Sequence, residues 1–214
     1  AALLVETVVG ISGGGLSQNA SAAKIASALH EHRERLLVIA YLSIVYAGAF
    51  LIYLGSLYNL LREENTRSRM LSSLVLAGGA LFIALHAVSD IGINSFLGAK
   101  LTSVGPGQTQ GVAYTLYLLT YALDGVGDVF GSVAAFAAGL LVIKSGLLPR
   151  WLGLVAMVAG ILLFVQAFGL GGVIATFGLV FDLIGFLLLL IFVLVSSVIQ
   201  LTRAAVAPDG AARE

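Results

Sequence analysis

Two pairs of ionisable residues stand at helical spacing inside otherwise apolar stretches of the sequence. His86 and Asp90 are four residues apart, and so are Asp124 and Asp128, which lie in the run YALDGVGDVFG. Residues four apart share one face of an α-helix, so each pair can act on a neighbouring helix. One imidazole and three carboxylates are suitable ligands for Zn²⁺ in a tetrahedral site or for Mn²⁺ in a larger shell. The spacing therefore favours a divalent-metal site formed by these four residues.

Four further polar residues are expected to support the predicted ligands. Asn94 continues the first stripe at the same spacing, and Tyr121 precedes the second pair by three residues on one face. Gln166 and Asp182 lie in two later apolar stretches. Hydrogen-bonding partners of this kind orient the side chains that bind a metal. We assign that orienting role to Asp182, Gln166, Tyr121 and Asn94.

The composition assigns the chain to the membrane proteins. Of 214 residues, 59% are hydrophobic and only 10% are charged, whereas soluble domains carry about 25% charged residues. A surface so poor in charge has to face lipid. Eleven Lys and Arg balance eleven Asp and Glu, so no net charge attracts nucleic acid. The absence of cysteine excludes disulfides, thiolate metal sites and thiol catalysis.

Five apolar segments are each long enough to cross a hydrocarbon core of about 30 Å. Backbone amides in lipid must bond within their own segment, so these segments are helices. We predict an all-α fold, a polytopic transmembrane helix bundle in one membrane domain, with five full spans, a partial N-terminal helix and an outer amphipathic helix. The expected bounds are 1–12 for the partial or interfacial helix, 18–35 for the amphipathic surface helix, about 36–61, 71–98, 112–143, 151–169 and 173–200 for the spans, and 201–214 for the tail.

The distribution of basic residues predicts the orientation of the bundle. The end of a membrane protein that is richer in Lys and Arg faces the cytoplasm. One predicted end holds Arg62, Arg67, Arg69, Lys144, Arg150, Arg203 and Arg213, and the other holds Lys24, Arg33, Arg35 and Lys100. This distribution places the C-terminus in the cytoplasm and the amphipathic helix outside.

Counted along the helices from the cytoplasmic basic residues, the polar residues fall into two layers. At 1.5 Å per residue, the layers lie about 25 Å and about 31 Å above those charges. The lower layer holds His86, Asp128 and Gln166, and the upper layer holds Asp90, Asp124 and Asp182. Gly127 and Gly131, beside the aspartates, allow close approach of another helix. Four spans are thus predicted to bring polar groups together.

Carboxylates within a bilayer need an explanation, because each costs about 2.5–3.5 kcal/mol on insertion scales. The sequence has no Lys or Arg at the depth of these aspartates. Three states are open: the carboxyl groups are protonated, they share protons with His86, or they hold a cation. A further alternative is that the cluster hydrogen-bonds to Tyr, Ser and Asn of neighbouring helices and only fixes their packing.

Parts of the sequence resemble known families. The phrases AKIASALHEHRERLLVIAYL, LYNLLREENTRSRM and VIKSGLLPRWLGLVAMVAGIL resemble a family of bacterial multi-pass membrane proteins of unknown function. That resemblance implies a bacterial plasma membrane, a helical bundle and one more helix at the N-terminus, without a catalytic residue or a substrate. The HxxxD and DxxxD pairs are similar to the transport site of cation diffusion facilitators, which implies His86, Asp90, Asp124 and Asp128 as ligands. The cytoplasmic domain and His-rich loop of that second family have no counterpart in the sequence.

Three functional hypotheses follow. The first is a small membrane transporter or sensor that binds Zn²⁺, Mn²⁺ or protons. The second is a non-catalytic structural subunit of a larger membrane complex, and the third is a membrane-embedded metallohydrolase in which the metal activates water. The sequence contains no zincin, phosphate-loop or dinucleotide-binding motif, so we favour a protein that is not an enzyme. Expected partners are the lipid bilayer and other membrane subunits or a second copy, not nucleic acid.

Overall fold

The computed structural model describes residues 21–62, 66–93, 96, 106–167 and 175–206. All regular structure within these ranges is helical, which confirms the predicted all-α class. The helices are α2 (Ala22–Glu31), α3 (Arg33–Leu61), α4 (Thr66–His86), the π-helix η1 (Ala87–Ile93), α6 (Pro106–Ser145), α7 (Arg150–Ala167) and α8 (Ala175–Val206). The partial helix predicted at 1–12 lies outside the described residues.

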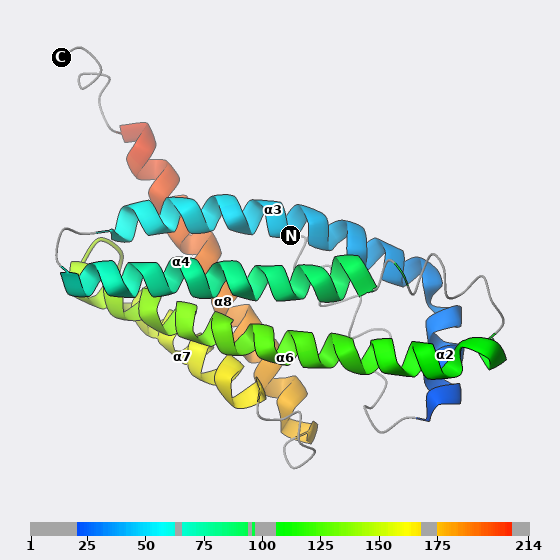
Figure 1. Ribbon diagram of the computed structural model, residues 1–214. Coiled ribbons are helices and arrows are strands. Elements are labelled where there is room, and N and C mark those ends of the chain that lie inside the picture. The colour runs from blue at the N-terminus through cyan, green and yellow to red at the C-terminus, as the bar shows by residue number, and fades with distance from the viewer. Residues whose placement is uncertain (1–20, 63–65, 94–95, 97–105, 168–174, 207–214) are drawn as a thin grey trace.

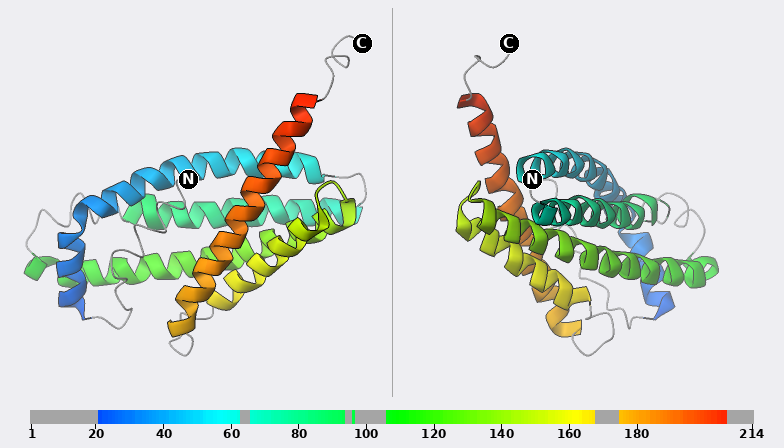
Figure 2. Two further views of the ribbon diagram at one scale, coloured as in Figure 1. Left: turned by 180° about the vertical axis from the view of Figure 1, so that it is seen from behind. Right: turned by 60° about the vertical axis from the view of Figure 1, so that its left-hand side comes forward.

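The long helices form one bundle with α6 at its centre. Helices α3, α4 and α6 lie side by side, and α7 packs along α6 (Figure 1). Helix α8 packs against α7 and crosses the other helices at a steep angle (Figure 2). Helix α2 lies across one end of the bundle, against α6. Because α6 packs against both α4 and α7, its residues are the ones that can meet several helices at once.

Five helices of the described chain are long and apolar enough to cross a membrane. They are Arg33–Leu61, Arg69–Ile93, Gln110–Ser145, Arg150–Ala167 and Leu183–Thr202. Large apolar side chains also cover the outside of the bundle; Ile52 is 78% exposed and Val198 is 59% exposed. Such a surface would be unfavourable in water and is favourable in hydrocarbon. The apolar helices imply a lipid bilayer environment.

The amphipathic helix is shorter than predicted and turns sharply into the first long helix. Helix α2 begins after Ser21, whose side chain accepts a hydrogen bond from the Lys24 backbone nitrogen at 3.3 Å. It ends at Glu31, and a turn at His32 redirects the chain into α3. The apolar side of α2 is buried against α6, where Ile25 and Ala113 belong to one cluster.

A glycine ends α6 and reverses the chain into α7. Gly146 has φ +65°, a left-handed conformation that glycine adopts without strain. Its backbone nitrogen bonds to the Val142 carbonyl oxygen at 3.2 Å, and the Leu147 nitrogen bonds to the Ser145 hydroxyl at 3.3 Å. These bonds pair polar backbone groups at the end of α6. Only four residues then separate α6 from α7.

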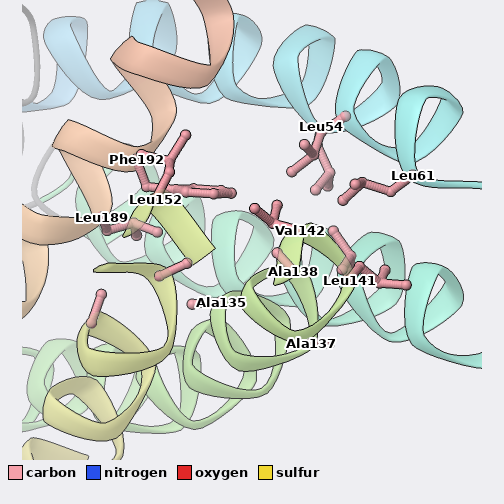
Figure 3. Packing of buried hydrophobic residues seen from close by; sticks show 14 of the residues in the cluster. Leu54, Leu61, Ala135, Ala137, Ala138, Leu141, Val142, Leu152, Leu189 and Phe192 are labelled. Carbon is pink, nitrogen blue, oxygen red and sulfur yellow. The ribbon is translucent and has the colours of Figure 1, made fainter. Parts of the chain in front are cut away.

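The main core lies where α3, α4, α6, α7 and α8 meet. Figure 3 shows leucines of α3 facing the small residues of α6, with Leu152 of α7 and Phe192 of α8 on the other side. Alanine and glycine on α6 let the neighbouring helix backbones come close. A Cβ added to Gly139 would lie 2.5 Å from the Gly153 carbonyl oxygen. The same closeness joins α4 to α6, where a Cβ added to Gly78 would lie 2.8 Å from the Phe130 carbonyl oxygen, and it holds these two helices in the register that forms the polar site.

Candidate functional site

The central contact of the site joins α4 to α6. Nε2 of His86, the last residue of α4, lies 3.6 Å from Oδ1 of Asp128 on α6. Asp128 is among the most buried side chains of the described chain, with 1% of its surface exposed. The structure therefore brings together two of the four predicted ligands, one from each stripe.

The other ring nitrogen of His86 fixes the state of the imidazole. Nδ1 lies 3.0 Å from the carbonyl oxygen of Phe82. A carbonyl oxygen can only accept a hydrogen bond, so Nδ1 must carry a proton and donate it. In a neutral imidazole, Nε2 then has a lone pair facing the carboxyl group of Asp128. The pair therefore has a place for one further proton, either on the carboxyl group or on Nε2.

Two glycines next to Asp128 make room for this contact. A Cβ added to Gly127 would lie 2.8 Å from Nδ1 and Cε1 of His86, and one added to Gly131 would lie 2.5 Å from Cδ2 of Phe82. The imidazole and the phenyl ring thus rest directly on the α6 backbone. Gly127 and Gly131 were predicted to allow the close approach of another helix, and this geometry agrees with that prediction.

Aromatic rings surround the imidazole on the remaining sides. The ring centroid of Phe82 lies 4.4 Å from that of His86, and the centroid of Phe186 on α8 lies 6.0 Å away, edge-on. Phe50 of α3 stacks on Phe82 at 5.9 Å. On the side of these rings no polar group screens the interaction between the imidazole and the carboxyl group.

Asp124 extends the site by one helical turn along α6. Its carboxyl group lies beside Ser89 of η1 and within electrostatic reach of His86. Ser89 has no exposed surface. Ser89 Oγ is placed to hydrogen-bond to the Asp124 carboxyl group, and within the described part of the chain Asp124 Oδ1 has no other hydrogen-bond partner. These two atoms provide hydrogen-bonding capacity directly beside the pair.

The other predicted residues are placed differently. Asp90 is half-buried on η1, the π-helix that begins directly after His86, and its role as a ligand stays a prediction. The Tyr121 hydroxyl bonds to that of Tyr117 at 3.0 Å. Gln166 is half-buried near the end of α7, and its Oε1 has no hydrogen-bond partner among the described residues. Asn94 and the side chain of Asp182 lie outside the described residues.

The predicted metal ligands do not form a complete coordination group in the described part of the chain. No three His, Asp or Glu side chains there are arranged to hold a metal ion. The site seen in the structure is the pair of His86 and Asp128 with Asp124 beside it. The ligand set that also includes Asp90 stays a prediction.

Sequence reasoning missed three contributors to the site. Ser89 is one of few polar residues in its stretch and lies one helical turn after His86, a signal that could have identified it. The carbonyl oxygen of Phe82 carries no sequence signal, because every residue has one. The approach of Phe186 depends on the crossing angle of α8, which apolar patterning does not encode.

The chain was compared with protein families, curated proteins and solved structures. Residues 1–199 match a family model described as a domain of unknown function (DUF4386). No curated protein and no solved structure gave a match. The matched range contains every residue of the site described above, and the description of the family assigns no activity to any of them.

Proposed function

Because the chain belongs to the DUF4386 family, a domain of unknown function, we propose its function from its own site: an integral membrane protein with a buried cation-binding site that binds a proton. The observation that carries the proposal is the 3.6 Å contact between His86 Nε2 and Asp128 Oδ1. The hydrogen bond from Nδ1 to the Phe82 carbonyl oxygen supports the proposal, because it leaves a lone pair on Nε2.

A proton is the cation that this geometry accommodates without any further ligand. An uncompensated carboxylate among aromatic rings is unfavourable, and a proton held between the carboxyl group and the imidazole removes that cost. Asp124 lies one turn along α6 from the pair, toward the end where α6 packs against α2, and Ser89 of η1 lies beside it. We infer that they pass the proton between the pair and that end of the bundle, as the first step of a proton-coupled transporter or of a proton sensor.

We propose that the five candidate spans cross a bacterial plasma membrane with the C-terminus in the cytoplasm. The majority of basic residues at the Lys144 end of the bundle supports this orientation. The α2 end would then face outward, and the pair would exchange protons with the outer side.

Infrared spectroscopy of the purified protein tests proton binding directly. During a pH titration, we expect the carbonyl stretch of a protonated carboxyl group to change with pH. Asp128→Asn should abolish this band change, and His86→Gln should shift its midpoint. The matched control is Glu34→Gln, the same chemical change at an exposed carboxylate of α3, which should leave the band change intact. Identical titrations of the wild type and Asp128→Asn would refute proton binding at the pair.

A divalent cation is the second candidate, favoured by the orientation of His86. Histidines that bind metals usually donate their other N–H to a carbonyl or carboxylate oxygen, as Nδ1 does to Phe82. The unbonded Oδ1 of Asp124 would be a second ligand atom beside Asp128. A membrane-embedded metallohydrolase would require this metal and, in addition, a bound water that it activates.

Metal analysis of detergent-purified protein separates the two candidates. Stoichiometric Zn²⁺ or Mn²⁺ that is lost in Asp128→Ala, but kept in the His30→Ala/His32→Ala control at the end of α2, would support the metal site. Absence of metal together with the infrared band would support the proton site. If neither is found and Asp128→Ala only lowers the unfolding temperature, the cluster acts in helix packing, as expected of a non-catalytic subunit.

A further inference from the structure

An apolar groove opens on the surface of the bundle, and the His86–Asp128 pair does not line it. It has a volume of about 320 Å³ and runs between α4, α6 and α7. Its walls include Leu74, Val133, Phe136, Leu140 and Phe164.

The floor of the groove is formed by the close approach of α6 and α7. A Cβ added to Gly160 would lie 2.8 Å from the Ser132 carbonyl oxygen. The one hydroxyl group in the lining, that of Ser132, donates to the Val129 carbonyl oxygen at 2.7 Å. The groove therefore offers no unused polar group, and its occupant has to be a hydrocarbon chain.

The groove leads to a basic rim at the Lys144 end of the bundle. Lys144 follows the groove residue Leu140 by one helical turn on the same face of α6. Arg150 begins α7 and precedes the groove residues Ile161 and Phe164 by 11 and 14 residues, which places it on their face. Both basic side chains are exposed.

The exposed charged residues that flank the groove lining along the chain are basic. Arg69, also exposed, stands two residues before the groove residue Leu71 on α4. No Asp or Glu occurs in residues 66–85 or 129–167, which contain every residue of the groove lining. Basic residues next to membrane-facing apolar surface attract anionic lipid headgroups. The apolar groove thus suits an acyl chain, and the basic rim suits the anionic headgroup of the same lipid molecule.

We propose that this groove binds an anionic phospholipid. One acyl chain lies between α4, α6 and α7, and the headgroup phosphate lies at Lys144 and Arg150. Each basic residue near a membrane surface contributes an attraction that corresponds to about a fivefold change in lipid affinity. A zwitterionic lipid could place its chain in the groove but would gain less from the rim.

Fluorescence quenching by brominated lipid tests this proposal. Trp151 is the single tryptophan, so Trp151→Phe provides a background without fluorescence from tryptophan. In this Trp151→Phe background, Phe136→Trp places a reporter in the groove. Val158→Trp places a control reporter on α7, at a 46% exposed position outside the groove lining. Both proteins are reconstituted in phosphatidylcholine vesicles with increasing fractions of phosphatidylglycerol that carries brominated acyl chains.

We expect half-maximal quenching of the Phe136→Trp reporter at a phosphatidylglycerol fraction about fivefold or more below that of the Val158→Trp control. The Lys144→Ala/Arg150→Ala double variant should lose this difference, whereas Arg62→Ala, which removes a charge from the same end of the bundle at α3, should keep it. Equal quenching of both reporters would refute a lipid site in the groove. A preference that persists in the double variant, or that brominated phosphatidylcholine reproduces, would refute recognition of the headgroup charge.

Discussion

At the scale of single residues, the state of His86 depends on the space left by Gly127. The imidazole donates to the Phe82 carbonyl oxygen, faces Asp128 with its other nitrogen and lies against the α6 backbone. Each of these contacts constrains the same ring. A change that displaces the ring by a few tenths of an ångström therefore alters its bonds on both sides, although it leaves every titratable group in place.

We predict that Gly127→Ala disturbs the site more than it disturbs the fold. The added methyl group would lie 2.8 Å from Nδ1 and Cε1 of His86, which are atoms of a side chain that can rotate away. We expect a loss of about 1 kcal/mol in the free energy of unfolding, together with a shifted or abolished infrared band change of the Asp128 carboxyl group. Thermal unfolding and the pH titration measure the two effects.

Gly111→Ala is the matched control for Gly127→Ala. It makes the same change on the same helix, at a position where nothing lies within 4 Å of the added Cβ. Because alanine favours helix over glycine by up to about 1 kcal/mol, this variant should be as stable as the wild type or more so, with an unchanged titration. An unaltered titration of Gly127→Ala would contradict the geometry described for His86.

The site was predictable from sequence as far as α-helical geometry determined it. The DxxxD spacing places Asp124 and Asp128 one turn apart on α6, and the meeting of His86 with Asp128 agrees with their common predicted depth. The change from an α-helix to a π-helix immediately after His86 was not predictable from the spacing. Such a change depends on side-chain packing in three dimensions and often occurs at functional sites.

At the scale of elements, the contact between α6 and α7 determines how firmly the bundle is held together. Gly139 and Gly153 face each other across this contact: a Cβ on either would lie 2.5 Å or 2.8 Å from the carbonyl oxygen of the other. Helices in lipid gain little from hydrophobic attraction to one another, so packing of this closeness stabilises their association.

We predict that Gly139→Ala destabilises the bundle. The atom that opposes the new methyl group belongs to the backbone of α7, so α7 itself must move, unlike the ring opposite Gly127. The expected loss is about 1–3 kcal/mol in the free energy of unfolding, measured by denaturation in detergent. Gly55→Ala on α3, with nothing within 4 Å of its added Cβ, is the control. Equal stability of the two variants would contradict close contact between α6 and α7.

At the scale of the whole molecule, the bundle is longer than the hydrocarbon layer it is expected to cross. Helix α6 has 40 residues and is therefore about 60 Å long, about twice the thickness of the hydrocarbon core. The part near its N-terminus packs against α2, where Ile25 and Leu29 are buried. The molecule thus has a lipid-facing bundle and, at one end, a continuation in which two helices cover each other.

Hydropathy predicted the bundle but not this continuation. It indicated a helix over about 112–143, whereas α6 covers Pro106–Ser145. Hydropathy marks the residues that suit lipid, whereas the packing of α6 against α2, at residues such as Ala113, depends on the three-dimensional fold. The break between the amphipathic helix and the first span was predicted at 35–36, and the structure places it at His32.

The absence of cysteine from the sequence permits a direct test of orientation. Ala23→Cys adds a thiol on exposed α2, and Pro149→Cys adds one at the exposed turn between α6 and α7; these positions lie at opposite ends of the bundle. In intact cells, a maleimide that does not cross membranes should label Ala23→Cys and should label Pro149→Cys only after permeabilisation.

The physical reason for this outcome is the excess of Lys and Arg at the Pro149 end, which is retained in the cytoplasm during insertion. Labelling of the permeabilised Pro149→Cys sample serves as the control for thiol reactivity. Labelling of Pro149→Cys alone in intact cells would mean that the bundle has the opposite orientation. The α2 end would then face the cytoplasm, and the His86 site would exchange protons on that side. Labelling of both thiols in intact cells would contradict the odd number of spans between them, and with it the assignment of α3, α4 and α6 as membrane-crossing helices.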